Sequence, residues 1–203
     1  MMKNGSNPER LTILFILSLS CISGCFWRRD KWQKPEDVMQ HLQIRKGDRI
    51  ADIGAGEGYF TFRLADATGT QGRVYAVDVS TKKLEAVRKQ FGEQGYLQVV
   101  PVLAAADDPR LPEPVDLIFL CNAYHHLTGR VEYFRNIKRY LRPRGRVAII
   151  ELNELPWYAR WFLRKHRTEA SVIKNEMKQA GFELVEKHDF LPYQEFMIFR
   201  SRE

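Results

Sequence analysis

The stretch ADIGAGEGYFTFRLA (residues 51–65) constrains the fold most, because it runs from a short apolar segment through a glycine-rich turn into a segment with helical periodicity. A strand that enters a helix through such a turn is typical of nucleotide-binding α/β proteins. The dinucleotide fingerprint G-x-G-x-x-G would need a glycine at position 59, where this chain has tyrosine. The spacing G-x-G-x-G, from Gly54 to Gly58, therefore disfavours a dinucleotide and leaves another nucleotide-like ligand or a purely structural turn.

The rest of the chain alternates between strand and helix periods. The runs VDLIFL and RVAIIEL are almost continuously apolar, as is typical of strands buried on both faces of a parallel sheet. We predict an α/β fold with a seven-stranded, mostly parallel sheet, helices on both faces, and a last strand that pairs antiparallel at or near an edge. The predicted strands are 49–53, 74–79, 98–103, 115–120, 147–152, 182–188 and 195–200, and the predicted helices are 35–42, 59–67, 80 or 81 to 93, 131–141 and 168–180.

Composition fits one such domain. The chain has 203 residues, of which 44% are hydrophobic, and this is enough for one well-packed α/β domain with at most a short appendage. The formal net charge of +7 is not gathered into a basic stripe, so we expect no nucleic-acid partner.

The amino-terminal segment has the features of an export signal. Lys3 and Arg10 precede the uncharged run LTILFILSLSCIS, which is short for a membrane-spanning helix. The tetrad ISGC at residues 22–25 resembles the bacterial lipobox and implies lipidation of Cys25. We expect a membrane-anchored bacterial lipoprotein, or a cytoplasmic protein if the leader is not processed; an uncleaved hydrophobic anchor and a mis-assigned start are the alternatives. The expected organisation is a leader (1–25), a linker (26–34) and one folded domain (35–203).

The cysteines and histidines do not have the spacing of a metal site. Cys21 would be lost with the leader, and the remaining Cys25 and Cys121 are too few for a disulfide framework or a zinc site. The pair His125-His126 lacks a third ligand at suitable spacing. We therefore expect no metal, and we interpret Cys121 as a small buried hydrophobic residue.

An acidic residue precedes the glycine turn, so that residues 52–58 read DIGAGEG. In this form the turn resembles the first motif of class I S-adenosylmethionine-dependent methyltransferases. The resemblance covers residues 35–199 and implies a Rossmann-like fold, S-adenosylmethionine as cofactor, and cofactor binding by Asp52, Gly54, Gly56 and Gly58. A side chain at these glycines would collide with the methionine part of the ligand, whose carboxylate can face backbone N–H groups at the helix start.

Two positions after later strands fit an adenosine. Asp78 ends the second predicted strand twenty residues after Gly58, where a carboxylate can accept hydrogen bonds from both ribose hydroxyls. Val79, beside it, and Asn122, after the fourth strand, are also expected to bind the cofactor.

Two loops resemble later motifs of the same family. The loop AADDPRLP (residues 105–112) resembles the adenine-side loop, and Asp107 is expected to meet the adenine amino group, with Asp108 as the weaker candidate. The turn LRPRGR (residues 141–146) resembles the family's L-x-P-G-G turn but has Arg144 at the first glycine. This departure concerns the loop before the fifth strand and leaves the cofactor prediction intact.

Candidates for catalysis follow the fourth strand, in the sequence VDLIFLCNAYHHL. A base is needed only when the methyl acceptor carries a proton. We predict His125 as the substrate-side base or orienting residue, with Tyr124 as the second candidate. Because two successive histidines point in different directions, at most one of His125 and His126 is expected to face the pocket, and a structural role is the alternative for each.

An aromatic and basic segment, ELPWYARWFLRKHR (residues 154–167), follows the fifth predicted strand. Trp157 and Trp161 are four residues apart, so a helix would show both on one face. In relatives resembling the ubiquinone and menaquinone C-methyltransferases, substrate-covering elements occur at this place. The segment is predicted to cover a hydrophobic acceptor or to lie in a lipid interface, and packing of both tryptophans on the sheet is the alternative.

These features predict a methyltransferase that uses S-adenosylmethionine and acts on a small-molecule acceptor, which is hydrophobic if the aromatic segment covers it. One alternative is a noncatalytic, membrane-anchored binding or scaffold lipoprotein that keeps the fold, because an exported domain would need an unusual supply of a cytosolic cofactor. A second is a protein isoaspartate O-methyltransferase, whose first motif is similar.

Overall fold

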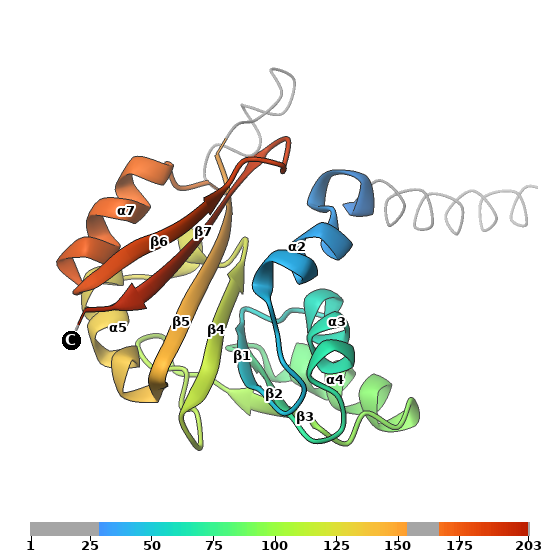
Figure 1. Ribbon diagram of the computed structural model, residues 1–203. Helices are drawn as coiled ribbons and strands as arrows, with labels where there is room; N and C mark the ends of the chain where they lie inside the picture. The colour runs from blue at the N-terminus through green and yellow to red at the C-terminus, as the bar shows by residue number, and fades with distance from the viewer. Residues whose placement is uncertain (1–28, 154–166, 203) are drawn as a thin grey trace, which may run out of the picture.

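Residues 29–153 and 167–202 are described in the computed structural model, and these parts of the chain form one seven-stranded sheet with helices on both faces (Figure 1). The strands are β1 (Arg49–Ile53), β2 (Arg73–Asp78), β3 (Val99–Leu103), β4 (Val115–Cys121), β5 (Leu141–Leu152), β6 (Phe182–His188) and β7 (Gln194–Ser201). The helices are α2 (Pro35–Leu42), α3 (Tyr59–Thr68), α4 (Thr81–Glu93), α5 (Arg130–Ile137) and α7 (Ala170–Gln179), with short 3₁₀ turns η1 (Tyr124–His126) and η2 (Lys138–Tyr140).

The strand order is β3-β2-β1-β4-β5-β7-β6. The pairs formed within β1 to β5 are all parallel. Strand β7 runs antiparallel to both β5 and β6. From β1 the chain first builds outward to β2 and β3 and then returns to place β4 on the other side of β1. Ligands of open α/β sheets bind beyond the carboxyl ends of the strands at such a reversal. The predicted Rossmann-like fold is therefore confirmed, and its topology points to the carboxyl ends of β1 and β4 as the place for a ligand.

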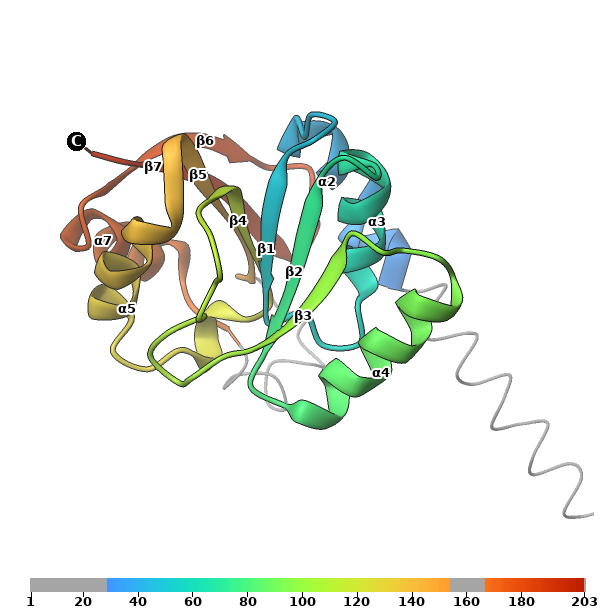
Figure 2. The same ribbon diagram turned by 90° about the horizontal axis from the view of Figure 1, so that it is seen from below.

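Successive side chains of each strand point to opposite faces of the sheet, and helices cover both faces. Ala51 and Ile53 pack in the same cluster as residues of α5 and α7, whereas Ile50 packs with residues of α2 and α3. Helix α4 covers the edge near β3 on the side of α3, as both views show (Figures 1 and 2). Burial on both faces explains why the parallel strands read as almost continuous apolar runs.

Local sequence signals set several helix boundaries. Pro35 occupies the first turn of α2, where its missing N–H leaves no partner unsatisfied. Ser80 is the N-cap of α4, and its side chain accepts a hydrogen bond from the Lys83 N–H at 3.4 Å. Both boundaries agree with the prediction.

The start of β5 differs from the prediction. The helix expected to reach residue 141 ends at Ile137, and β5 begins at Leu141 rather than at 147. Leu141 pairs with Val115 at the beginning of β4, and a register shift separates this pair from the regular part of the ladder. The sequence LRPRGR was predicted as a turn, but it has backbone partners on β4 that local propensity does not reveal, so it forms an irregular strand.

The described part of the expected linker packs against the domain. Residues 29–33 are helical, and Gln33 is 1% exposed. Arg29 lies over the ring of Tyr59 at 3.8 Å, and Gln33 Nε2 donates to Cys121 Sγ at 3.4 Å. This segment therefore packs against the start of α3 and the carboxyl end of β4.

Two predicted features lie outside the described residues: the leader with Cys25, and most of the aromatic segment with Trp157 and Trp161. Within the described residues, no helix has the combination of length and apolar character that crossing a bilayer requires.

Candidate cofactor and acceptor site

The glycine turn between β1 and α3 is held against neighbouring strands. Gly54, Gly56 and Gly58 have φ values of 77°, 60° and 85°, all in the left-handed region that favours glycine. The Gly54 N–H donates to the Val77 carbonyl oxygen of β2 at 2.8 Å. A Cβ added to Gly54 would lie 2.6 Å from the Cβ of Ala123, which follows β4. The turn is thus close-packed at Gly54 even without a ligand.

Substitution of Gly54 by alanine is expected to destabilise the protein more than the same change at Gly56. Both changes force alanine to a positive φ, at a cost of about 1–2 kcal/mol. Only Gly54→Ala adds a collision with Ala123, since a Cβ at Gly56 meets nothing closer than 4.0 Å, and overpacking adds roughly 1–3 kcal/mol. Urea unfolding of both variants measures the difference. Equal losses of unfolding free energy would contradict the close packing at Gly54.

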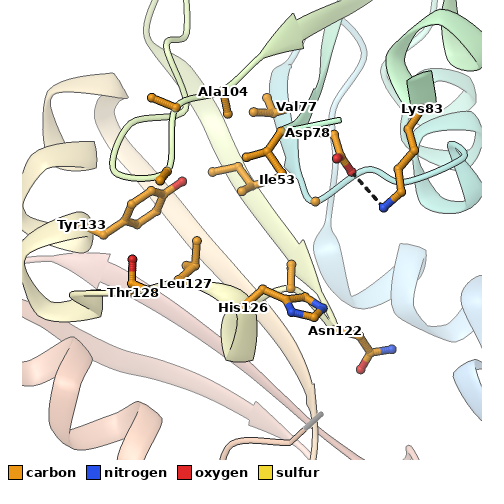
Figure 3. A pocket seen from close by; sticks show the side chains of 15 residues that line it. Ile53, Val77, Asp78, Lys83, Ala104, Asn122, His126, Leu127, Thr128 and Tyr133 are labelled. Carbon is orange, nitrogen blue, oxygen red and sulfur yellow. Dashed lines mark ion pairs between the residues drawn. The ribbon is translucent and has the colours of Figure 1, made fainter. Parts of the chain in front are cut away.

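Asp78 lies at the carboxyl end of β2 with its carboxylate fixed by two backbone groups. Oδ2 accepts the Gly56 N–H at 3.1 Å, and Oδ1 accepts the Ser80 N–H at 2.9 Å. The carboxylate is 6% exposed, and the half-exposed Lys83 approaches it with an N···O distance of 3.7 Å (Figure 3). Because Lys83 is half-exposed and its nitrogen lies 3.7 Å from the carboxylate, this contact is weak, and a ligand hydroxyl can replace Lys83 beside the carboxylate.

A cavity of about 520 Å³ lies where these elements meet, beyond the carboxyl ends of β1, β2 and β4 (Figure 3). Its walls are largely apolar, with few polar groups, which is typical of a pocket for a small organic ligand. Four residues predicted to bind the cofactor line it: Gly54, Asp78, Val79 and Asn122. Residues that the sequence had not indicated also line it, among them Lys83, Leu127, Thr128 and Tyr133.

Asp52 lies beneath the turn and is not one of the residues that line the cavity. Its carboxylate is 3% exposed and accepts a hydrogen bond from Thr61 Oγ1 of α3 at 2.6 Å. Burial raises the pKa of Asp52 to about 7, with the nearby Asp78 charge acting in the same direction and the Thr61 hydrogen bond opposing it. Asp52 therefore ties β1 to α3 and sets the conformation of the turn.

The raised pKa of Asp52 predicts that the ligand-free protein loses stability as pH rises from about 4 to about 7. Between these pH values the folded state keeps the Asp52 proton, which the unfolded state releases. The free energy of unfolding therefore falls as the pH rises, until the pH passes the folded-state pKa of Asp52. Each tenfold difference in proton affinity between the two states corresponds to about 1.4 kcal/mol, so a loss of a few kcal/mol is expected. Urea unfolding at pH 5 and pH 8 should show this loss in the native protein and a smaller one in Asp52→Asn. Identical pH profiles for the two would contradict the assignment.

The two aspartates of the predicted adenine-side loop differ in position. Ala104, Ala105 and Ala106 line the cavity, whereas Asp107 follows them as an exposed residue and does not line it. Asp108 fastens the loop, because its Oδ1 accepts the Arg110 N–H at 2.7 Å and the Tyr140 hydroxyl at 2.9 Å. The role of Asp107 at an adenine amino group stays a prediction.

Tyr124, predicted as a catalytic candidate, points away from the cavity. It is fully buried, and its hydroxyl donates to Glu176 Oε2 of α7 at 2.7 Å. Arg130 makes a bidentate pair with the same carboxylate, with distances of 2.7 and 2.9 Å. Burial and the bond to Glu176 raise the pKa of Tyr124 well above its ordinary value. The geometry therefore gives Tyr124 a packing role and does not support it as a base.

The two histidines occupy different environments. His126 lines the cavity, whereas His125 does not. Nδ1 of His125 lies 2.9 Å from Oε1 of Glu151, which is fully buried at the end of β5. The two imidazole rings are 4.0 Å apart between centroids. One signal in the sequence could have indicated Glu151, since it is the only acidic residue in the apolar run RVAIIEL.

Asn122 and Cys121 end β4 beside these groups. Asn122 adopts φ 53°, and its side-chain oxygen accepts a hydrogen bond from Gln194 Nε2 of β7 at 2.9 Å. Burial raises the pKa of the Cys121 thiol to about 12, so it carries no thiolate at neutral pH. Within residues 29–153 and 167–202, no group of three or more His, Cys, Asp or Glu side chains is arranged to hold a metal ion.

Comparison with known proteins agrees with this geometry. Residues 50–145 match the family model described as methyltransferase domain. A demethylmenaquinone methyltransferase of Anoxybacillus flavithermus is 25% identical over 130 residues, covering 64% of this chain and 54% of the relative. The ubiquinone/menaquinone biosynthesis C-methyltransferase UbiE of Teredinibacter turnerae is 30% identical over 114 residues, covering 55% of this chain and 45% of the relative. The chain thus spans about half the length of these relatives.

A solved structure shows the same fold over most of the chain. The crystal structure of a SAM-dependent methyltransferase from Aquifex aeolicus superposes with a TM-score of 0.75 at 21% identity, covering 84% of this chain and 91% of that one. Residues 50–145 therefore resemble the methyltransferase-domain family, and the chain has the fold of S-adenosylmethionine-dependent methyltransferases.

Proposed function

We propose that this protein transfers a methyl group from S-adenosylmethionine to a small-molecule acceptor. The observation that carries the proposal is the placement of Gly54 and the fixed Asp78 carboxylate on one cavity of about 520 Å³, within a region that matches the methyltransferase-domain family. S-adenosylmethionine would supply a methyl group already activated by its sulfonium. The chain's own residues then have to bind the cofactor and the acceptor and orient them. When the acceptor carries a proton, they also have to remove it.

The residues around the cavity fit that cofactor. Asp78 presents carboxylate oxygens that can accept hydrogen bonds from ribose hydroxyls, and Gly54 contributes no side chain to the cavity wall. The apolar walls provided by Ile53, Val77 and Leu127 suit the faces of an adenine ring.

We propose that His125, oriented by Glu151, accepts the proton of a protonated acceptor; because His125 does not line the cofactor cavity, the acceptor would bind beside that cavity. When Nδ1–H is donated to the buried Glu151 carboxylate, Nε2 is the basic nitrogen of the ring. A second contact, from the His125 N–H to Glu151 Oε2 at 3.3 Å, fixes the same residue through its backbone. Glu151 thereby restricts both the tautomer and the orientation of the imidazole.

For the acceptor, we propose a hydrophobic molecule of the quinone type. Two observations support this class: relatives named as demethylmenaquinone and ubiquinone/menaquinone methyltransferases, and the tryptophan-rich sequence that follows β5. Transfer of a tritiated methyl group to demethylmenaquinone in detergent, compared with a polar catechol, tests it. Preference for the catechol would exclude the hydrophobic class.

Calorimetric titration of S-adenosylhomocysteine into the full chain tests the cofactor assignment. We expect one site per chain with micromolar affinity. The absence of binding by a protein that unfolds cooperatively would reject the methyltransferase activity and favour the noncatalytic scaffold.

We also propose that Cys25 is lipidated and anchors the domain to a bacterial membrane. The support is the sequence: basic residues, an uncharged apolar run and the tetrad ISGC. Fractionation of cells that produce the native chain or Cys25→Ser tests this. The native chain is expected in the membrane fraction with incorporated palmitate, and equal labelling of both chains would overturn the assignment.

A further inference from the structure

A second cavity, of about 470 Å³, lies at the end of the sheet opposite the cofactor site. The loop before β1, the first residues of β5 and the carboxyl end of β7 form it, and these segments meet at the amino ends of the parallel strands (Figure 1). Its charged lining consists of four arginines and two aspartates: Arg45, Arg144, Arg146, Arg200, Asp48 and Asp116.

Both aspartates already have partners. Asp116 Oδ2 accepts the Arg49 backbone N–H at 2.9 Å and pairs with Arg142 at 3.1 Å. Asp48 Oδ2 accepts the Arg45 backbone N–H at 2.9 Å. Asp116 is therefore paired with an arginine that does not line the cavity, and Asp48 is held by a backbone N–H.

The arginine side chains are in the opposite situation. In the described parts of the chain, Arg45, Arg144, Arg146 and Arg200 have no carboxylate oxygen within 4.0 Å of their guanidinium nitrogens. Arg146 and Arg200 are direct cross-strand partners in the β5–β7 ladder. Like charges at such positions repel each other, and with four arginines against two aspartates the lining keeps an excess of positive charge.

Arg146 shows the consequence of this arrangement. Its guanidinium donates to the backbone oxygens of Leu42 and Gln43, but its Nε is buried without a hydrogen-bond partner among the described residues. Burial is the main cause that lowers the pKa of Arg146; the nearby charges of Asp48 and Glu186 oppose this effect, and the smaller effects of Arg200 and Arg45 add to it.

Arg144 adds a fourth cation from a position that favours glycine. Its φ is 67°, in the left-handed region where a side chain is disfavoured. A glycine here would meet the backbone requirement without strain, yet the chain has an arginine whose side chain lines the cavity. Backbone strain of this kind is often found at ligand-binding positions.

We propose that this cavity binds a phosphate group. Guanidinium groups suit phosphate because their planar forks make paired, charge-assisted hydrogen bonds to its oxygens. A phosphate would compensate the Arg146–Arg200 repulsion and give the cavity the counter-charge that its two aspartates do not supply. The group could be carried by a soluble phosphomonoester or by an anionic lipid headgroup, and the proposal does not depend on methyl transfer.

Titration of inorganic phosphate into the ¹⁵N-labelled full chain, at constant ionic strength kept with chloride, tests the site. Amide resonances of residues 144–146 are expected to shift with saturation. The double variant Arg144→Gln/Arg200→Gln is expected to weaken binding at least tenfold. The matched variant Arg88→Gln/Lys89→Gln removes the same charge from the exposed surface of α4 and should leave affinity within twofold.

Two results would overturn the proposal: shifts that do not saturate, or equal losses of affinity in both double variants, which would indicate general electrostatic attraction. Glycerol 3-phosphate and vesicles of phosphatidic acid in phosphatidylcholine then identify the source of the phosphate. Displacement of inorganic phosphate by the vesicles, and not by phosphatidylcholine alone, assigns a lipid headgroup. Displacement only by glycerol 3-phosphate assigns a soluble ligand. Thermal unfolding of each variant verifies that it is folded.

Discussion

Replacement of Asp78 by alanine is expected to weaken binding of S-adenosylhomocysteine by roughly 100-fold or more. Hydrogen bonds to a charged group contribute about 1.5–3 kcal/mol each, and a ribose offers two hydroxyls to this carboxylate. The variant also removes the acceptor of the Gly56 N–H, so the glycine turn loses one of its attachments to β2. Calorimetric titration measures the loss directly.

Glu85→Ala is the matched control for this prediction, because Glu85 is an exposed carboxylate on α4, close to Asp78 in sequence. It removes the same charge and should leave the affinity within twofold. Asp78→Asn keeps an acceptor oxygen and should fall between the two. An affinity of Asp78→Ala equal to that of Glu85→Ala would place the ribose elsewhere and remove the main support for the cofactor assignment.

Most of the fold could be predicted because its signals are local. The buried strands are apolar without interruption, and glycine, proline and serine mark the turns between elements. The start of β5 could not be predicted in this way. Leu141 joins the sheet because Val115, 26 residues earlier, offers backbone partners there, and no property of the sequence LRPRGR indicates them.

The cofactor side of the site could be predicted for a similar reason. Asp78 ends one strand, and Gly54 and Asn122 directly follow two others. Because the carboxyl ends of these strands lie at the same edge of the sheet, strand assignment alone brings the three residues together. The histidines could not be distinguished from sequence. Which of them faces the cavity depends on the 3₁₀ turn η1 and on Glu151, which belongs to another strand.

This difference between the histidines leads to the second large expected effect. His125→Asn should lower the rate of methyl transfer to a protonated acceptor by about 10²-fold or more, the usual contribution of a positioned base. Its affinity for S-adenosylhomocysteine should stay within threefold, because His125 does not line the cavity. His126→Asn is the matched control and should show the reverse, with altered cofactor affinity and a smaller change in turnover.

Glu151 is expected to act through His125, and a double-mutant cycle can separate this positioning role from a general structural one. Glu151→Gln keeps the size of the buried side chain and an acceptor for the His125 Nδ1–H, but it removes the charge that orients the ring. Turnover should fall about tenfold or more without loss of cofactor affinity. If Glu151 works only through His125, the double variant should be no slower than His125→Asn alone, since a base that is absent cannot be misplaced. Additive losses of turnover in the cycle would show that the Glu151 carboxylate contributes independently of His125. Unchanged turnover in His125→Asn would mean that the acceptor needs no base from this residue.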